Sequence, residues 1–499
     1  MAIEREAKYE ADADATLPDF GTLPDVRGTR EQNELLEAEY YDTAELRLLR
    51  SGITLRRRKG GHDAGWHLKL PAGPGSREEI QLPLGRGGRR VPAELANLVK
   101  ARSRGAELGL VAVITTQRQA ITLLGGDGEP LAEVADDQVR ATATASGSSE
   151  PVQWREIEVE LGGGGEDLLD AADNVLQRAG MRRSGRQAKL ERVLASQLSE
   201  PTAPPPADGT AGTVVTAYLR AHADRLLAMD PMVRQQVPDA VHKMRVATRR
   251  LRSTLRSFDT VTADSQHVAE ELKWLGTVLG DERDAEVQAL RLQAHIRATE
   301  IDVLLGPVQA RVQAHAAKAA AASHSAVMTA LSSERYYAML DALEELIASP
   351  EAGPNAGRSA GKFLPAAVRR SYRKTRRRMH AADLKPPGPA RDSALHAARK
   401  SAKRTRYAAE AAVGVGGEQA QRFAGQMKNV QSLLGDHHDT VVGRQLSRRL
   451  GIAAHLSGES AFSYGLFYER DVCSAERLDL RARKTWRRAC QRKYRAWLA

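Results

Sequence analysis

Charged side chains alternate along short segments of the first 200 residues. In a strand, successive side chains point to opposite faces. Glu4, Glu6 and Lys8 then share one face of the opening segment, and the segment REIEVEL places three more carboxylates on one face, those of Glu156, Glu158 and Glu160. Like charges on one strand face repel each other. A solvated outer face is one interpretation of this pattern, and a face that holds cations is the other.

Basic residues occupy other predicted strands of the same region. GITLRRRKG places Arg56 and Arg58 on one face, HLKLP offers Lys69, and ITTQRQA offers Arg118, each in a short segment near glycine or proline. Acidic and basic strands together predict a closed barrel with a charged interior. About eight strands leave room inside for side chains or one ligand.

One further acidic segment, LAEVADDQV, places Glu133 and Asp137 on the same face, so we predict that Asp137 rather than Asp136 points inward. Carboxylates are the oxygen ligands that Mg²⁺ and Mn²⁺ prefer, and guanidinium and ammonium groups neutralise phosphate oxygens. The expected ligand is therefore a triphosphate with a divalent cation. Phosphoryl transfer depends mainly on positioning and electrostatic stabilisation, which such an interior supplies.

These residues resemble the CYTH, or triphosphate tunnel metalloenzyme, superfamily. Residues 4–8 match its ExExK signature, and YYDTAELRL, ITLRRR, HLKLP, TQR, EVADDQ, REIEVEL and AKLERVL follow in order up to about residue 197. The resemblance implies an eight-stranded antiparallel β tunnel with flanking helices. It implies metal ligands at Glu4, Glu6, Glu158 and Glu160, and phosphate-binding or catalytic groups at Lys8, Arg56, Arg58, Lys69, Arg118 and Lys189. As a separate hypothesis, we expect Asp137 to position a water or a second ion. His67 and Ala44 depart from the usual family pattern.

A two-part pattern occurs twice in the C-terminal half. HKMRVATRRLR begins at His242 and HAARKSAKRTR at His396, an offset of 154 residues. Each copy is followed by a second shared block, with Gly280 and Gly435 in equivalent places. The nearly equal offsets predict two similar helical units, within residues 212–350 and 362–499.

Cations recur at helical spacing in both copies. Steps of three and four residues place each set along one helix face. The two sets are His242, Arg245, Arg249 and Arg252, continuing to Arg256, and His396, Arg399, Lys403 and Arg406. Lys243, Arg250, Lys400 and Arg404 are weaker candidates. Cations without interleaved acids repel one another, and a bound polyanion would relieve this repulsion. The alternatives are that the stripe is a solvated face and that the histidines are structural.

Acidic residues flank the same helices. Asp239 and Asp392 each follow a turn or loop that contains proline, and we expect them to cap the helices. The paired GDxxD blocks contain Asp281, Asp284, Asp436 and Asp439, which we expect to anchor arginines rather than to bind metal.

The repeated blocks resemble the CHAD domain, over roughly residues 212–499. This resemblance implies an all-α domain of two pseudo-symmetric four-helix bundles around a basic groove, with inorganic polyphosphate as ligand. The two sets of four cations that begin at His242 and His396 become the predicted polyphosphate contacts. A further basic run, VRRSYRKTRRRMH, adds positive charge at residues 368–380.

The composition agrees with two halves of different character. Residues 1–200 contain 27 Lys and Arg against 33 Asp and Glu, and residues 201–499 contain 47 against 30. The Pro- and Ala-rich stretch near residue 200 predicts a linker at 198–211 between domains at 1–197 and 212–499. The charged N-terminus and the absence of long apolar runs predict a cytoplasmic protein, with polyphosphate granules as a potential location. Cys473 and Cys490 are expected to be ordinary thiols.

The sequence leads to one hypothesis with three competitors. We expect metal-dependent hydrolysis of inorganic triphosphate with Mg²⁺ or Mn²⁺, in a protein whose helical domain binds polyphosphate. A class IV adenylate cyclase is the enzymatic alternative, and a non-catalytic granule protein is another. Nucleic acid is a competing polyanion, but aromatic residues make up only 4% of the chain and no base-stacking platform is evident, so we expect nonspecific binding at most. The oligomeric state stays open.

Overall fold

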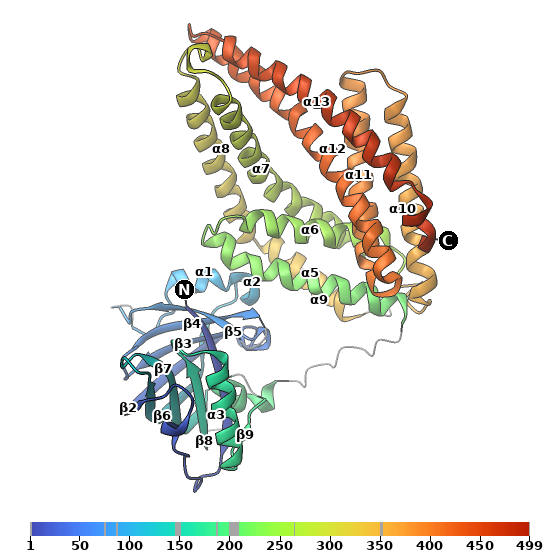
Figure 1. Cartoon of the computed structure of the whole chain (residues 1–499). Coiled ribbons are helices and arrows are strands. Elements are labelled where there is room, and N and C mark those ends of the chain that lie inside the picture. Colours follow the sequence, from blue (N-terminus) through green and yellow to red (C-terminus); the bar gives the residue numbers. More distant parts are fainter. Residues whose placement is uncertain are drawn as a thin grey trace. The chain divides into compact units, whose positions relative to one another are not determined.

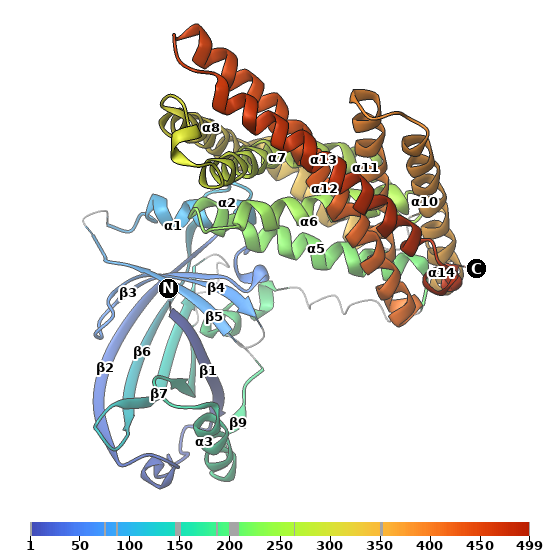
Figure 2. The same cartoon turned by 45° about the horizontal axis from the view of Figure 1, so that its top comes forward.

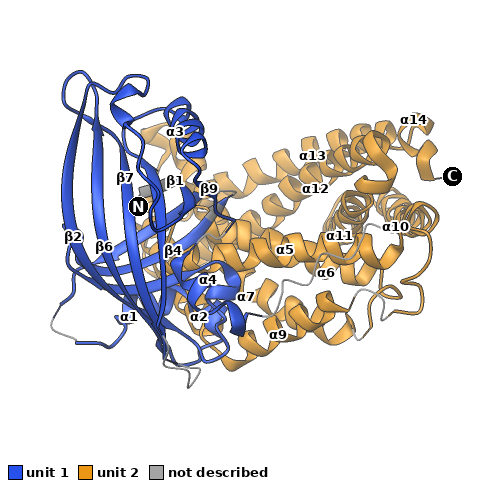
Figure 3. Ribbon diagram, turned by 90° about the horizontal axis from the view of Figure 1, so that it is seen from below, with its two compact units in different colours: residues 1–202 blue, residues 203–499 orange. Residues whose placement is uncertain are grey.

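The computed structural model describes residues 2–73, 76–85, 88–144, 151–185, 188–198, 209–263, 265–349 and 353–498; at residues 2–4 and 72 it describes only the backbone. The chain divides into two compact units, residues 1–202 and 203–499 (Figures 1 and 3). Of the predicted linker at 198–211, residues 199–208 lie outside the described residues.

The first unit is a closed β barrel, as predicted (Figure 2). Its neighbouring strands run in the order β5-β4-β3-β2-β6-β7-β8-β1, all antiparallel, and pairing of Ala2–Arg5 with Ser76–Glu79 joins β1 to β5 and closes the barrel. The strands in the described residues are β1 (Ala2–Ala11), β2 (Gly28–Asp42), β3 (Thr54–Lys59), β4 (Gly65–Gly73), β5 (Ser76–Leu82), β6 (Gly109–Leu124), β7 (Pro130–Ala143), β8 (Val152–Leu161) and the short β9 (Arg182–Arg183), which pairs with β1.

The alternation predicted for β8 sorts its side chains between the two faces of the barrel wall. Ile157 and Val159 are buried in an apolar layer outside the barrel, where α3 (Glu166–Arg178) covers them with residues such as Leu168. The glutamates between them face the interior. The other helical segments of this unit are η1 (Phe20–Thr22), η2 (Leu49–Ser51), α1 (Ala93–Leu98), α2 (Lys100–Ser103), α4 (Lys189–Val193) and η3 (Ala195–Gln197).

The second unit is helical in its described residues. Its helices are α5 (Ala211–Arg234), α6 (Ala240–Ser257), α7 (Ser265–Arg297), η4 (Ile301–Val303), α8 (Val308–Leu331), α9 (Glu334–Ala348), α10 (Ala360–Asp383), α11 (Pro389–Ala411), α12 (Val413–Leu456), α13 (Phe462–Ala489), α14 (Arg492–Arg495) and η5 (Ala496–Leu498). α12 is kinked at Gly417, whose φ is 53°. None of the described helices combines the length and apolarity needed to cross a membrane.

The repeated blocks lie on equivalent pairs of helices. The first copy occupies α6 and α7, which pack together, and the second occupies α11 and α12, which also pack together (Figures 1 and 2). The predicted helical spacing is therefore correct.

Neither predicted capping aspartate makes a capping hydrogen bond, although Asp239 occupies the N-cap position of α6. Asp239 precedes α6 with a φ of 65°, and its side chain makes no capping hydrogen bond. Asp392 lies inside the first turn of α11, which Gly388 precedes, and its carboxylate instead accepts a hydrogen bond from Arg444 at 2.7 Å. The proline-containing turns fix these helix starts without the expected side-chain oxygen.

Candidate functional site

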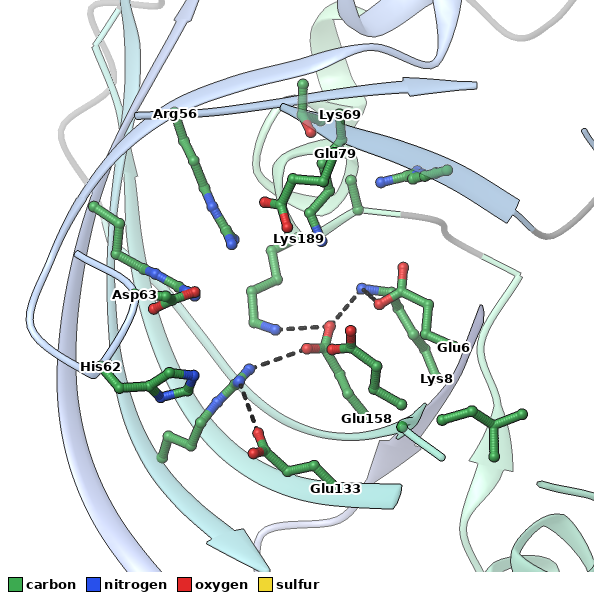
Figure 4. A pocket seen from close by; sticks show the side chains of 18 of the residues that line it. Glu6, Lys8, Arg56, His62, Asp63, Lys69, Glu79, Glu133, Glu158 and Lys189 are labelled. Atoms are coloured by element: carbon green, nitrogen blue, oxygen red, sulfur yellow. Dashed lines mark hydrogen bonds and ion pairs between the residues drawn. The ribbon is translucent and has the colours of Figure 1, made fainter. Parts of the chain in front are cut away.

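The barrel encloses a charged cavity of about 420 Å³ (Figure 4). Nine of the predicted tunnel residues line it: Glu6, Lys8, Arg56, Arg58, Lys69, Arg118, Glu158, Glu160 and Lys189. Asp137 lies behind this lining, fully buried against Arg118 and Lys189. The side chain of Glu4 lies outside the described part of the structure.

Strand register places three glutamates in one row across the barrel wall. Glu133 on β7 is paired with Glu160 on β8, and Glu160 is paired on its other side with Glu6 on β1. Side chains directly opposite each other on neighbouring strands are about 4.5–5.5 Å apart at Cβ, and like charges there are destabilising. We call Glu133, Glu160 and Glu6 the carboxylate row.

The carboxylate row has the electrostatics of a cation site. Burial raises the pKa of Glu160; Lys69 opposes this rise, while Glu6, Glu158 and Glu133 reinforce it. A divalent cation would relieve this accumulation of negative charge, and hard carboxylate oxygens are the ligands that Mg²⁺ and Mn²⁺ favour. The residue types of the row are those expected for the predicted metal, with Glu133 as an addition, whereas the carboxylates close enough together among the described residues to hold an ion are Asp137, Glu156 and Glu158.

A second group of carboxylates surrounds an ammonium group. Lys189, at the start of α4, places Nζ at 2.8 Å from Asp137 Oδ2, 2.7 Å from Glu156 Oε1 and 2.9 Å from Glu158 Oε1. These three carboxylates are close enough together to hold a metal ion, but Lys189 lies among them here. Burial opposes the charged forms, yet Lys189 holds the pKa of Asp137 low and, with Lys8, holds that of Glu158 well below its usual range.

Arg118 and Lys8 complete this ion-pair network. Arg118 forms a two-point pair with Asp137, with Nε–Oδ1 at 2.8 Å and Nη2–Oδ2 at 2.7 Å, and also contacts Glu158 at 3.0 Å. Lys8 pairs with Glu158 and, at 3.3 Å, with Glu6 (Figure 4). Glu158 therefore joins three cations that come from β1, β6 and α4.

The cavity wall formed by β3 is crowded with positive charge. Burial, together with the neighbouring Arg56 and Arg118, lowers the pKa of Arg58 to about 10. Arg58 pairs with Asp63, yet the buried Nε atoms of Arg56 and Arg58 lack hydrogen-bond partners among the described residues. Burial raises the pKa of Tyr40, but Arg56, Lys189 and Lys8 together outweigh burial and the net shift is downward. This wall is suited to bind an anion.

Residues beyond those predicted from the sequence also line the cavity. Tyr40, Asp63, Arg77 and Glu79 line it. His67, named only as a departure from the family pattern, is buried behind the lining; its Nδ1 lies 2.7 Å from Glu79 Oε1 and its Nε2 lies 2.8 Å from the Asp63 carbonyl. Alternation along β5 could have revealed Arg77 and Glu79, as it revealed Arg56 and Arg58.

The helical unit brings predicted polyphosphate contacts from both repeats together. Burial, together with the arginines of both helices, lowers the pKa of Lys403 on α11 to about 7. We call these residues the cationic cluster: Lys403 with Arg249, Arg399, Arg245 and Arg252. The Nε atoms of Arg245, Arg249 and Arg252 are buried without hydrogen-bond partners in the described residues.

Both predicted histidines lie near this cluster. Burial and His438 lower the pKa of His396 to about 4, with contributions from Lys400, Arg399 and Lys403, and the two imidazole rings lie 4.0 Å apart. Burial and Arg283 lower the pKa of His242. The Nδ1 atoms of His242 and His396 also lack partners among the described residues.

Arg406, another predicted contact, has partners within the helical unit. Its Nε donates to Glu410 at 2.7 Å and its Nη1 donates to Gln431 at 3.2 Å. Arg250, a weaker candidate, pairs with the same Glu410 at 3.1 Å. These two arginines join the repeats through a shared carboxylate.

The repeated glycines make room for the repeated arginines. A Cβ on Gly280 would lie 3.2 Å from Nη2 of Arg245, and a Cβ on Gly435 would lie 3.5 Å from Nε of Arg399. Asp284, one turn beyond Gly280, pairs with Arg245 at 2.9 Å, the anchoring role expected for that block. The second shared block of each repeat thus positions the first arginine of the preceding block.

Comparisons with known proteins match both units. The CYTH domain model matches residues 2–193, and the CHAD domain model matches residues 217–448. Two uncharacterized proteins of Mycobacterium tuberculosis, from strains CDC 1551 and H37Rv, are each 39% identical over 493 residues, covering 95% of this chain and 94% of the relative.

Two solved structures are similar to part of the chain. PptA from Streptomyces chartreusis is 19% identical with a TM-score of 0.47, covering 56% of this chain and 99% of that one. The CHAD domain from the plant Ricinus communis is 24% identical with a TM-score of 0.42, covering 58% of this chain and 92% of that one. The matched domains and the relatives that extend over nearly the whole chain establish that this protein belongs to the family of CYTH domain proteins that also contain a CHAD domain.

Proposed function

We propose that the barrel hydrolyses inorganic triphosphate with the help of Mg²⁺ or Mn²⁺. The observation that carries this proposal is the opposed crowding of charge in one cavity. The carboxylate row concentrates negative charge, and Arg56 and Arg58 concentrate positive charge on another part of the lining. A triphosphate with a divalent cation neutralises both the negative and the positive charge. This favours the metal–triphosphate complex as ligand over an anion or a cation alone.

The carboxylate row and Glu158 are the groups proposed to hold the metal. Glu160 supports this role because its pKa is raised by burial and by the neighbouring Glu6, Glu158 and Glu133, although Lys69 opposes the rise. When bound, a divalent cation supplies Lewis acidity to phosphate oxygens. The Asp137, Glu156 and Glu158 group is a weaker choice, because Lys189 already neutralises it.

The cations are proposed to divide into two roles. Arg56, Arg58 and Lys69 bind and orient the phosphate groups, since guanidinium groups match phosphate oxygens in geometry and charge. Lys189 instead acts on the chain's own carboxylates and is a positioning residue. Arg118 does both, because Asp137 fixes its guanidinium group from behind while the same group lines the cavity.

Phosphate release from inorganic triphosphate tests this proposal. Full-length protein with Mn²⁺ or Mg²⁺ is expected to release phosphate, and Glu160→Gln and Arg56→Gln are each expected to reduce kcat/KM by about 10²–10³-fold, the scale for loss of one transition-state contact. Glu37→Gln is the matched control, because Glu37 is exposed on β2. Full activity in Glu160→Gln would contradict the assignment of the metal side.

We further propose that the cationic cluster of the helical unit binds inorganic polyphosphate. Buried arginines with unpartnered Nε atoms around a lysine of lowered pKa are costly without a counter-ion. A chain of phosphates supplies closely spaced charges and needs no aromatic platform. Titration of the full-length protein with polyphosphate, with and without Arg249→Gln, tests this; equal affinity in both proteins would contradict it.

A further inference from the structure

A second arginine-lined cavity lies beside the C-terminus of the helical unit. It has a volume of about 290 Å³, and α10 lines it together with Arg495 of α14 and Leu498 of η5. We call it the C-terminal arginine pocket. Its lining residues are Arg369, Tyr372, Arg373, Arg376, Arg495 and Leu498. The arginines of α10 belong to the basic run that the proposed function leaves unused.

The charges in this pocket are not balanced by acids. Within the described residues, Arg369, Arg373 and Arg376 form no ion pair with a carboxylate. Arg495 donates from Nε to the carbonyl of Cys490 at 2.8 Å, and its guanidinium carbon lies 5.6 Å from the centre of the Tyr372 ring. Four guanidinium groups around one cavity therefore lack a fixed counter-ion in this part of the chain.

The wall behind these arginines is held in place. Tyr372 is buried, and its hydroxyl donates to Cys490 Sγ at 3.3 Å. Its ring packs against Phe423 of α12 and Trp486 of α13, with ring centres 5.8 Å away in both cases. Contacts with α12 and α13 thus fix Tyr372 in the pocket wall, and Arg373 and Arg376 of the same helix are exposed beside it.

α10 also contributes charge next to the helices of the cationic cluster. Arg404 of α11 lowers the pKa of Lys374, with smaller contributions from burial, Arg378 and Arg256 of α6. Burial, Arg256 and Arg252 in turn lower the pKa of Arg404. Arg252 belongs to the cationic cluster. Positive charge therefore continues from the cationic cluster to α10. The two sides of α10 are separated by the diameter of the helix, about 10–12 Å.

We infer that the C-terminal arginine pocket is a second binding site for the same linear polyphosphate chain. This inference rests on polyphosphate binding by the cationic cluster. A chain long enough to cross α10 contacts both sites, and a short chain occupies only one. Because the second contact is intramolecular, it raises the affinity for long chains without changing that for short chains. The pocket thereby gives the protein a preference for long chains.

The test compares short and long chains in one set of proteins. The pocket variant combines Arg369→Gln, Arg373→Gln and Arg376→Gln. The control variant removes the same charge at Lys318, Arg448 and Arg449, which are exposed on α8 and α12 and belong to neither site. Calorimetric titration uses full-length protein with a polyphosphate shorter than the helix diameter and with a long polyphosphate.

The wild type and the control variant are expected to bind the long chain at least about tenfold more tightly than the short one. The pocket variant should bind the short chain as the wild type does and lose most of this ratio. An unchanged ratio in the pocket variant would overturn the inference while leaving the proposed function intact. If the wild type bound neither chain, polyphosphate binding itself would fail. An equal loss in the control variant would show a general charge effect and would also overturn the inference.

Discussion

The ammonium group of Lys189 lies 2.8 Å from a carboxylate oxygen of Asp137, a side chain with no exposed surface. Asp137 is also held by Arg118 through two hydrogen bonds. A buried carboxylate shared by two cations from different elements ties α4 to β6 and β7. The cations of the tunnel are therefore not equivalent, since some hold the barrel interior together and others face the open cavity.

Replacing Lys189 by methionine should destabilise the first unit strongly. The substitution leaves Asp137, Glu156 and Glu158 buried without their common cation, and breaking a buried pair in this way costs about 3–5 kcal/mol. Hydrogen exchange of β7 and β8 in the full-length protein measures the effect. Lys59→Met, at an exposed position of β3, should leave exchange unchanged. Equal protection in Lys189→Met would contradict the role given to Lys189.

The effect of Lys189→Met should depend on pH in a defined direction. In the wild type, Asp137 and Glu158 have pKa values below their usual range. Their stabilisation is present above the unfolded values of about 4 and is lost as pH falls through the lower folded values. In the variant these carboxylates protonate more readily. The difference in stability should therefore be fully present above about pH 4 and shrink as pH falls below that value, through the lower folded pKa values.

The sequence predicted the faces of the strands better than the contacts between them. Alternation correctly separated Asp137 from Asp136 and turned Glu158 inward. The contact between Lys189 and Asp137 depends on how α4 meets β7, which no local pattern encodes. The carboxylate row depends on strand register, so it became visible only when β7, β8 and β1 were aligned.

In the helical unit, the spacing predicted a stripe of cations but not their partners. Arg406 continues the three-and-four pattern, but Glu410 lies four residues further along the helix and pairs with it. That partner was readable from the sequence, since residues i and i+4 are neighbours on a helix. Asp239 and Asp392 show the opposite case, because the sequence predicted capping hydrogen bonds that the structure does not contain.

Metal affinity should depend on the carboxylate row. Glu6→Gln and Glu160→Gln each remove one charge from the proposed ligand set, and we expect each to weaken Mn²⁺ binding by at least about 10-fold. Titration of Mn²⁺ followed by electron paramagnetic resonance measures this without turnover. Glu37→Gln again serves as the control. Unchanged Mn²⁺ affinity in both row variants would place the metal elsewhere.

Polyphosphate binding should strengthen as pH falls from about 8 to about 6. Burial and four arginines lower the pKa of Lys403 to about 7 in the free protein. A bound polyanion favours the charged form and raises that pKa, so binding takes up a proton. Calorimetry in buffers of different ionisation enthalpy measures the uptake. Lys403→Met should remove most of the uptake near pH 7, and the same uptake in that variant would contradict this origin.

Gly280→Ala should weaken polyphosphate binding without destabilising the helix. The new Cβ would lie 3.2 Å from Nη2 of Arg245 and displace its guanidinium group, whereas alanine is favoured over glycine in a helix by about 1 kcal/mol. We expect a loss of affinity of roughly 2- to 5-fold, the scale of one modest hydrogen-bond contact, and an unchanged or higher melting temperature.

Gly435→Ala is the matched control for this prediction. Its Cβ would lie at an ordinary contact distance, 3.5 Å from Nε of Arg399, and affinity should not change. Equal losses of affinity in the two variants would contradict an effect transmitted through Arg245.

The most direct test of the central claim compares the products formed from inorganic triphosphate and from ATP by the full-length protein with Mn²⁺ or Mg²⁺. We expect metal-dependent release of phosphate from triphosphate, a higher kcat/KM for triphosphate than for ATP, and loss of both activities in Glu160→Gln. Formation of cyclic AMP as the main product would identify a cyclase. No turnover of either substrate, with polyphosphate binding retained, would contradict an enzymatic role for the barrel.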